Sequence, residues 1–502
     1  MRNLILCVLI ISGLALPLQA QNKREMRAAW IATMSRIDWP STTTSTTAQR
    51  QELLVMLDSL CALKFNAVIF QVRPMSDTFY FSEIEPWSRF LTGKQGVKPY
   101  PFYDPLAFLI REAHRRCMEV HVWLNPYRVG SQADVSQFDP SHLFFKKPEW
   151  FVRYGTQYYF NPGLAETREH LNNVVADIVS RYDVDAVHFD DYFYPYKVNG
   201  LEFPDDQTFK SYSRGFLDKD TWRRDNVNLV IAQLQHTIKS IKPWVEFGVS
   251  PFGIWRSDDK DPRGSNTKGS LSNYDDLHAD VLAWLERGDI DYVMPQLYWE
   301  IGKKSADYAH LVEWWKQHVY GKNLYVGLYA SNLGNPSASK AWRTGNEVMR
   351  QLHFNELHPQ VQGVAFFSTV ALMENRQGLR DSLHLYYKYP ALIPTNPNVK
   401  GQVSDPVHQV RVVHVKNEAY LQWNTLKAKD GCAVQYYVVY AFKGTNLGDF
   451  SNPANILTRT TDNCINLSEY SKQLQGNYRF AVTVINRFKY ESTPATVSKK
   501  RL

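Results

Sequence analysis

The sequence is poor in cysteine and lacks the common nucleophile, metal and nucleotide motifs. Its 502 residues include only 5 cysteines, too few for a fold held together by disulfides. It contains no G-x-S-x-G, H-E-x-x-H or C-x-x-C pattern, and no glycine-rich phosphate turn follows an early apolar segment. These absences argue against an elbow-type serine hydrolase, a zinc protease and a dinucleotide-binding domain. We expect no metal and no cofactor.

Charge is also scarce. Charged residues make up 21% of the chain, and the formal net charge is +7. No basic block is long enough to form a nucleic-acid-binding arm, so we expect no nucleic-acid partner.

Long apolar runs are absent except at the N-terminus. There Arg2 precedes LILCVLIISGLALPL, and the segment ends in an A-x-A-like pattern at Leu18 and Ala20. A basic start, a short apolar core and such an end are typical of a secretory signal. We expect residues 1–20 to be a signal peptide and the mature protein to be exported to the periplasm or cell envelope. No later segment is long and apolar enough for a membrane span.

Aromatic residues, in contrast, are abundant. They make up 14% of the sequence, with 14 Trp, 29 Tyr and 26 Phe. Such residues pack protein cores, and they also stack on the apolar faces of sugar rings. Their positions along the chain indicate which of them serve core packing and which could stack on a sugar.

Eight short apolar segments recur, most of them followed by a helix-like pattern. They are rich in Val, Ile, Phe and Tyr, as expected for parallel strands buried on both faces. The eight segments are 26–33, 66–74, 119–128, 185–193, 246–253, 291–299, 324–330 and 363–369. Helical patterns between them include 49–64, 104–117, 167–182 and 226–241. We predict an α/β fold, a (β/α)8 TIM barrel over residues 21–392.

Long irregular stretches follow the second to fifth of these strands. They span about 75–103, 129–165, 194–222 and 254–276, and they are rich in aromatics. Loops that follow barrel strands gather at the carboxyl-terminal face, where barrel enzymes have their active sites. The sequence therefore predicts a groove with aromatic walls at that face.

The composition changes before the C-terminal hundred residues. Residues 393–406 read as a proline-containing linker, and 407–502 show alternating apolar patterns separated by turn residues. The second segment resembles a fibronectin type III domain, a small all-β sandwich. Within it, Cys432 and Cys464 could pair in an oxidising compartment.

Strand alternation selects the candidate chemistry. If Asp190 of HFDDY points into the barrel, His188 does so too, because strand side chains alternate with a period of two. Asp191 follows directly, and adjacent partly buried carboxylates tend to have separated pKa values. Glu300, at the end of the sixth strand, is the best-placed second carboxylate from another strand, and Asp38 and Asp77 are weaker candidates.

At this point the sequence resembles the glycosyl-hydrolase-like 10 family. The resemblance covers most of residues 25–390 and is carried by strings such as QVRP (71–74), EVHVWLNPYRV (119–129), YDVDAVHFDDYFYPY (182–196), GVSPFGIWR (248–256) and DYVMPQLYW (291–299). It implies a barrel in bacterial envelope proteins, among them glycosidases that cut peptidoglycan glycan strands lacking stem peptides. By position it implies site roles for Asp190, Asp191, Arg73, Asn125, Tyr127, Arg128, Gln296, Tyr298 and Trp299.

We therefore expect an exported glycoside hydrolase acting on an N-acetylated glycan. Asp190 would be the central carboxylate, as nucleophile or orienting base, and Asp191 or Glu300 would be the general acid. Arg73 and Asn125 would hold substrate oxygens, with His188 nearby, and Trp299, Tyr127 and Tyr194 would stack on sugar rings.

Two alternatives stay open. HFDDY also resembles the fourth-strand signature of family 18 chitinases, but Tyr192 stands where those enzymes have a catalytic Glu. This difference favours a non-catalytic glycan-binding barrel. The other alternative is hydrolysis of a different polysaccharide.

Overall fold

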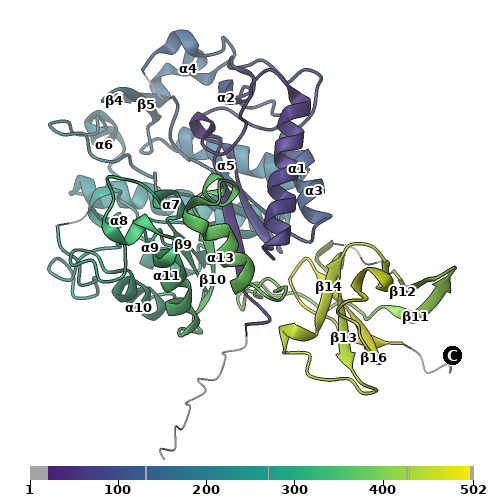
Figure 1. Ribbon diagram of the computed structural model, residues 1–502. Coiled ribbons are helices and arrows are strands. Elements are labelled where there is room, and N and C mark those ends of the chain that lie inside the picture. The colour runs from purple at the N-terminus through teal and green to yellow at the C-terminus, as the bar shows by residue number, and fades with distance from the viewer. Residues whose placement is uncertain (1–20, 131–132, 270, 426–427, 429, 498–502) are drawn as a thin grey trace, which may run out of the picture.

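The computed structural model describes residues 21–130, 133–269, 271–425, 428 and 430–497 (Figure 1). The expected signal peptide, residues 1–20, lies outside this part of the chain. The described chain forms a large α/β body followed by a smaller all-β body (Figure 1).

The larger body is a closed barrel of eight parallel strands in the order β1-β10-β9-β8-β7-β6-β3-β2. All eight apolar segments predicted from the sequence form strands of this barrel, so the predicted TIM barrel is confirmed. The strands are β1 Met26–Ile31, β2 Ala67–Arg73, β3 Glu119–Leu124, β6 Ala186–Phe189, β7 Glu246–Val249, β8 Tyr292–Val293, β9 Asn323–Leu328 and β10 Val361–Phe366.

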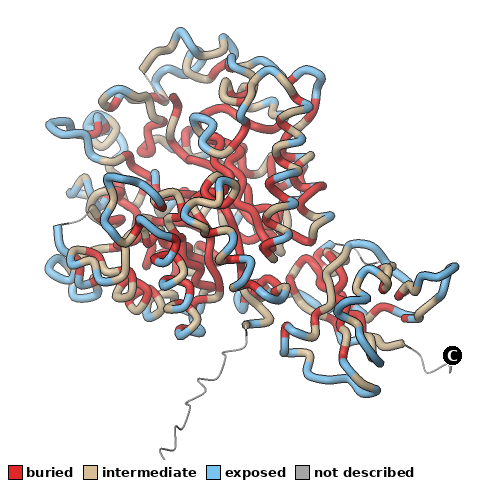
Figure 2. The backbone as a smooth tube through the Cα atoms, viewed as in Figure 1, coloured by how far each residue is buried: buried red, intermediate tan, exposed pale blue. Residues whose placement is uncertain are grey.

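Helices surround the strands, and the buried residues concentrate between the two layers (Figure 2). Side chains at helix starts accept backbone N–H groups: Ser45 caps α1 and Asp104 caps α3, where Pro105 fills the first turn. The α-helices are α1 Thr46–Ala62, α2 Arg89–Thr92, α3 Pro105–His114, α4 Leu143–Lys146, α5 Ala165–Arg181, α6 Asp206–Tyr212, α7 Lys219–Ile241, α8 Asn273–Asp276, α9 Val281–Arg287, α10 Tyr308–Gln317, α11 Asn346–Glu356, α12 Thr369–Met373 and α13 Leu379–Tyr386.

Alternation along the strands separates two cores. On β1, Ala29 and Ile31 belong to the layer between strands and helices, whereas Ala28 and Trp30 belong to the barrel interior. Both sets are buried, which explains why the strands read as nearly continuous apolar runs.

The long stretches after strands lie together at one end of the barrel (Figure 1). The stretch after β3 contains a short hairpin of β4 (Phe151–Tyr154) and β5 (Gln157–Phe160). Arg128 forms an isolated antiparallel bridge with Tyr159 of this hairpin, which holds the hairpin beside the end of β3. The β4–β5 hairpin therefore forms part of the wall at this end of the barrel.

The smaller body consists of two antiparallel sheets, β11-β12-β15 and β14-β13-β16-β17. Residues from both sheets share one apolar core that includes Trp423, Tyr437 and Val484. Its assignment as a fibronectin type III domain stays a prediction, and Cys432 and Cys464 are free thiols. The strands are β11 His408–Val415, β12 Glu418–Asn424, β13 Val434–Lys443, β14 Ile456–Thr460, β15 Cys464–Asn466, β16 Tyr478–Asn486 and β17 Ala495–Thr496.

The β body packs against the amino-terminal ends of the barrel strands, opposite the long loops (Figure 1). Arg459 of β14 donates to the carbonyls of Phe65, Cys117 and Ala391, at 3.3, 3.4 and 3.1 Å. Lys489, in the turn after β16, reaches the first residues of β3 and β7. Within the described residues, no helix has the length and apolarity that crossing a bilayer requires.

Candidate active site

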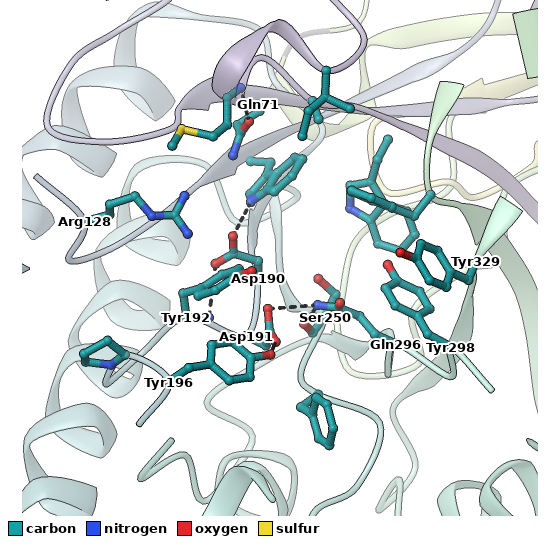
Figure 3. A pocket seen from close by; sticks show the side chains of 18 of the residues that line it. Gln71, Arg128, Asp190, Asp191, Tyr192, Tyr196, Ser250, Gln296, Tyr298 and Tyr329 are labelled. Atoms are coloured by element: carbon teal, nitrogen blue, oxygen red, sulfur yellow. Dashed lines mark hydrogen bonds between the residues drawn. The ribbon is translucent and has the colours of Figure 1, made fainter. Parts of the chain in front are cut away.

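A cavity of about 580 Å³ opens at the carboxyl-terminal ends of the barrel strands. Asp190 and Asp191 are the carboxylates among the residues that line it (Figure 3). Most of the remaining wall is aromatic: Trp30, Trp123, Tyr159, Tyr192, Tyr196, Phe252, Tyr298, Trp299, Tyr329 and Phe367.

Asp190 follows the last residue of β6 and is buried, with 4% of its surface exposed. The indole Nε1 of Trp123 donates to its Oδ2 at 3.1 Å, and the amide of Asn125 donates to its Oδ1 at 3.3 Å. Both donors come from β3 or its end, which is the next strand around the barrel. These bonds fix the orientation of the carboxyl group but are long.

Asp191 points to the other side of the cavity floor (Figure 3). The phenol of Tyr196 donates to its Oδ2, and the Gln296 amide donates to its Oδ1 at 3.2 Å. The same Gln296 nitrogen donates to the Ser250 carbonyl at 2.9 Å, which ties the end of β7 to the segment after β8.

The two carboxyl groups have different surroundings, which act on their pKa values. Burial, and next the negative charge of Asp191, raise the pKa of Asp190 to about 7, and the Arg128 cation and the Trp123 hydrogen bond only partly oppose this. Burial also raises the pKa of Asp191, against the hydrogen bonds from Tyr196 and Gln296. At neutral pH the site can hold a proton on Asp190 beside an ionised Asp191.

The walls on either side of this pair differ in character (Figure 3). On one side the rings of Tyr298 and Tyr329 stack with centroids 4.6 Å apart. On the other, the Arg128 guanidinium lies 4.6 Å from the centroid of the Tyr192 ring. A sugar chain placed over the carboxyls would meet flat apolar faces on one side and a cation on the other.

The sequence that forms this barrel matches a known protein family. The profile of the family described as glycosyl hydrolase-like 10 matches residues 25–344. The chain belongs to the glycosyl hydrolase-like 10 family.

Two curated relatives of this glycosyl hydrolase-like 10 protein are matched over more than four fifths of their own lengths. The protein is 42% identical over 437 residues to "Glycosyl hydrolase YngK" of Bacillus subtilis, covering 85% of this chain and 84% of the relative. It is 39% identical over 371 residues to "Glycosyl hydrolase DigH" of Escherichia coli K12, covering 69% of this chain and 83% of the relative. The protein is a glycoside hydrolase.

Solved structures that match part of the chain are distant in sequence. The glycoside hydrolase domain of PgaB from Bordetella bronchiseptica has a TM-score of 0.43 at 12% identity, covering 72% of this chain and 99% of that one. The catalytic domain of a β-amylase from Paenibacillus polymyxa has a TM-score of 0.47 at 9% identity, covering 73% and 98%.

The family barrel brings most of the residues predicted from the sequence together. Arg128, Asp190, Asp191, Gln296, Tyr298 and Trp299 line the cavity. Asn125 and His188 are buried beneath it: Asn125 holds Asp190, and His188 Nε2 lies 2.9 Å from the Ser250 hydroxyl. Four other candidates, Arg73, Tyr127, Tyr194 and Glu300, lie elsewhere.

Arg73 is the clearest correction. Regular alternation along β2 would place Gln71 and Arg73 on one face, but a register shift between them pairs Gln71 with Trp123 and Arg73 with Leu124. Such a bulge breaks the two-residue alternation. Gln71 consequently lines the cavity, whereas Arg73 is fully buried and forms a paired salt bridge with Glu85, with both N···O distances 2.6 Å.

Tyr127 and Tyr194 are packing residues, not stacking platforms. Tyr127 is 2% exposed and belongs to a cluster with Phe151 and Phe160 of the hairpin. Tyr194 is 2% exposed, and its ring packs edge-on against Phe203 and His278. Their rings have no face free for a sugar.

Glu300 does not line the cavity. The Trp342 indole donates to its Oε2 at 3.1 Å, and Lys303 lies 3.8 Å from Oε1. Although burial acts to raise the pKa of Glu300, these partners lower it, and the group is held as an anion. The second carboxylate of the site is therefore Asp191, from the same strand end as Asp190.

The two weaker candidates also have structural partners. Asp38 accepts from the backbone of Ala32 and Val370, both at 2.7 Å, and Asp77 accepts from the Gln95 amide at 3.3 Å. Burial raises the pKa of each carboxyl to about 6. Within the described part of the chain, no three His, Cys, Asp or Glu side chains are grouped as metal ligands.

Sequence reasoning missed Tyr196, Trp30 and Tyr329 as site residues. Tyr196 stands in the quoted YDVDAVHFDDYFYPY string, but its contact with Asp191 depends on how the loop after β6 folds back. Trp30 could have been found, because alternation on β1 places it inside the barrel near the carboxyl-terminal end.

Removing Arg73 should cost stability without removing a substrate contact. In Arg73→Ala, Glu85 is left buried with only His170 as a partner, 2.9 Å away. Breaking a buried ion pair costs about 3–5 kcal/mol, so urea unfolding should show that loss. A folded variant with unchanged stability but a greatly raised KM would instead restore Arg73 as a substrate ligand.

Proposed function

We propose that the protein hydrolyses glycosidic bonds in an N-acetylated glycan, specifically in peptidoglycan strands from which the stem peptides have been removed. The observation that carries the proposal is the buried pair of Asp190 and Asp191 on the floor of an aromatic cavity. Relatives named as glycosyl hydrolases support the reaction class.

The two carboxyls take different roles in this proposal. Asp190 carries the proton at neutral pH and gives it to the leaving glycosidic oxygen. Asp191, ionised and held by Tyr196 and Gln296, stabilises the positive charge that develops at the anomeric carbon. This order reverses the sequence-based expectation, in which Asp190 was nucleophile or base.

Two features of the wall support the kind of glycan. Tyr298 and Tyr329, with Trp299 nearby, offer aromatic surface for sugar rings and acetamido methyl groups. Arg128 supports a sugar acid: its guanidinium lines the cavity, lies over the Tyr192 ring and donates to the Pro74 carbonyl at 3.5 Å. Removing a stem peptide leaves a free carboxylate on every second sugar, which is the chemistry a lone arginine binds.

Measuring the release of glycan fragments tests the proposed hydrolysis directly. The pure protein should release soluble disaccharide-repeat fragments from amidase-treated peptidoglycan, detected by mass spectrometry. Asp190→Asn, which keeps the shape but cannot donate the acid proton, should lower kcat by about 10²–10⁴-fold. Fragment release by Asp190→Asn at the wild-type rate would contradict the assignment.

The pH dependence of the reaction follows from the raised pKa of Asp190. The acid form is required, so kcat/KM should fall as pH rises through about 7. It should also fall in acid, as Asp191 takes up a proton at a pKa above its ordinary value. The titratable side chains that face the Asp190 and Asp191 carboxyl groups include Arg128, Tyr192 and Tyr196. A rate that stays flat through neutral pH into alkali would rule out Asp190 as the acid.

Arg128 separates peptidoglycan from a neutral glycan. Arg128→Met keeps the aliphatic packing but loses the cation, so kcat/KM on denuded glycan should fall by about 10- to 100-fold. Chitin oligosaccharides, which lack the acid, should lose far less. Equal losses on both substrates would mean that Arg128 serves the carboxyl pair and that the substrate need not be a sugar acid.

We also propose that the protein works in the periplasm or cell envelope, after removal of residues 1–20. Supporting this are the basic start and short apolar core of that segment. N-terminal sequencing of protein from the envelope fraction should begin at Gln21, and an N-terminus retained in a cytosolic fraction would contradict the proposal.

A further inference from the structure

A polar chain runs through the barrel axis, below the cavity. It consists of Ser250, His188, Tyr292, His121 and Glu119, all at most 2% exposed. The steps are short: Ser250 Oγ to His188 Nε2 2.9 Å, His188 Nδ1 to Tyr292 Oη 3.0 Å, Tyr292 Oη to His121 Nδ1 2.9 Å, and His121 Nε2 to Glu119 Oε2 3.1 Å.

The barrel is shaped to hold this chain. A Cβ added to Gly248 of β7 would lie 2.0 Å from the Tyr292 ring, so the glycine makes the room that the phenol occupies. Both imidazoles contact the same Tyr292 oxygen, which links β8 to the mutually neighbouring strands β3 and β6.

The lower end of the chain meets the β body. Lys489 Nζ lies 3.2 Å from Glu119 and 2.8 Å from Glu246, and it is 3% exposed. Although burial disfavours the cation, the two carboxylates raise the pKa of Lys489. The β body therefore supplies a positive charge to the bottom of the barrel.

This charge decides the direction of every hydrogen bond above it. An ionised Glu119 only accepts, so a singly protonated His121 donates from Nε2 and accepts the Tyr292 proton at Nδ1. The Tyr292 oxygen then accepts from His188 Nδ1–H, and His188 Nε2 accepts from the Ser250 hydroxyl. Burial, and next His121, hold the pKa of His188 well below its ordinary value, so it has one proton to place.

The opposite direction is also geometrically available. If Glu119 were protonated it would donate to His121, every bond would reverse, and the Ser250 hydroxyl would turn to the Phe189 carbonyl, 3.4 Å away. In that state His188 occupies one lone pair of the Ser250 oxygen. In the first state both lone pairs of this cavity-lining oxygen stay available as acceptors.

We propose that Lys489 of the β body is a positioning residue for the active site, which it reaches through Glu119 and the axial hydrogen-bond chain. By favouring the first direction of the chain, it keeps both lone pairs of the Ser250 hydroxyl available to donor groups of the glycan, beside Asp191 and Gln296. The kinetic part rests on the proposed function, whereas the direction of the chain does not.

Two isosteric variants give a matched test. Glu119→Gln and Glu246→Gln remove the same charge from the same cluster, and both residues contact Lys489. Glu119 alone of the two bonds to His121. A Gln at position 119 can donate to His121 Nε2, which favours the reversed chain. Lys489→Met should act in the same direction because it removes the cation that contacts Glu119.

The readouts are histidine tautomers and steady-state kinetics. In ¹⁵N-histidine-labelled wild type, NMR should show the proton on Nε2 of His121 and on Nδ1 of His188, with His→Asn variants giving the assignments. Glu119→Gln and Lys489→Met should exchange both tautomers and lower kcat by about 10-fold at unchanged KM. Glu246→Gln should keep the wild-type tautomers and kcat, and thermal unfolding identifies any variant that fails to fold.

Two results would overturn the proposal: wild-type tautomers in folded Glu119→Gln, or the same loss of kcat in Glu246→Gln as in Glu119→Gln. If wild type cleaves no glycan but the tautomers exchange as expected, the proposed function fails while the chain direction stands. The two failures are therefore distinguishable.

Discussion

The structure depends on the repulsion between two carboxyl groups that adjacent residues bring to one buried strand end. Asp190 and Asp191 both lie almost completely out of solvent, where two neighbouring negative charges are costly. The surrounding residues give the two carboxyl groups different hydrogen-bond partners. Asp190 accepts from the Trp123 indole and the Asn125 amide at 3.1 and 3.3 Å. Asp191 accepts from the Gln296 amide at 3.2 Å and in a shorter contact from the Tyr196 phenol. One acid beside one anion avoids two adjacent buried charges, and it is the combination that glycoside hydrolysis uses.

The barrel below the pair is organised by the same constraint on buried polar groups. Small residues such as Ala28, Ala67 and Ala186 leave space in the interior, and the axial chain fills it. Every member of that chain has a partner, down to the Lys489 cluster. A buried network of this kind is costly when half satisfied and rigid when complete. The contact with the β body is therefore part of how the barrel interior is completed.

The fold could be predicted because its signal is local. Strands buried on both faces need nearly continuous apolar sequence, and all eight such segments became barrel strands. Alternation correctly grouped His188 with Asp190, because His188 lies in the regular strand β6 and Asp190 comes directly after it. Alternation failed at Arg73 because a single extra residue in β2 changes the direction of its side chain. No sequence pattern predicts that bulge.

The remaining errors concern contacts between distant segments. Tyr194 and Tyr127 look like loop aromatics in the sequence, but whether a loop ring faces a ligand or a neighbouring loop depends on tertiary packing. Glu300 ends the segment that carries Gln296, yet the chain turns it toward Trp342. Lys489 had no local signal at all, because its partners lie more than two hundred residues away in the chain.

Infrared difference spectroscopy of the folded protein measures the protonation of Asp190 most directly. The account predicts a protonated-carboxyl C=O band just below neutral pH that disappears with a midpoint of about 7 and is missing in Asp190→Asn. A band that survives in Asp190→Asn but is lost in Asp191→Asn would contradict the account, as would a site with no protonated carboxyl in that range.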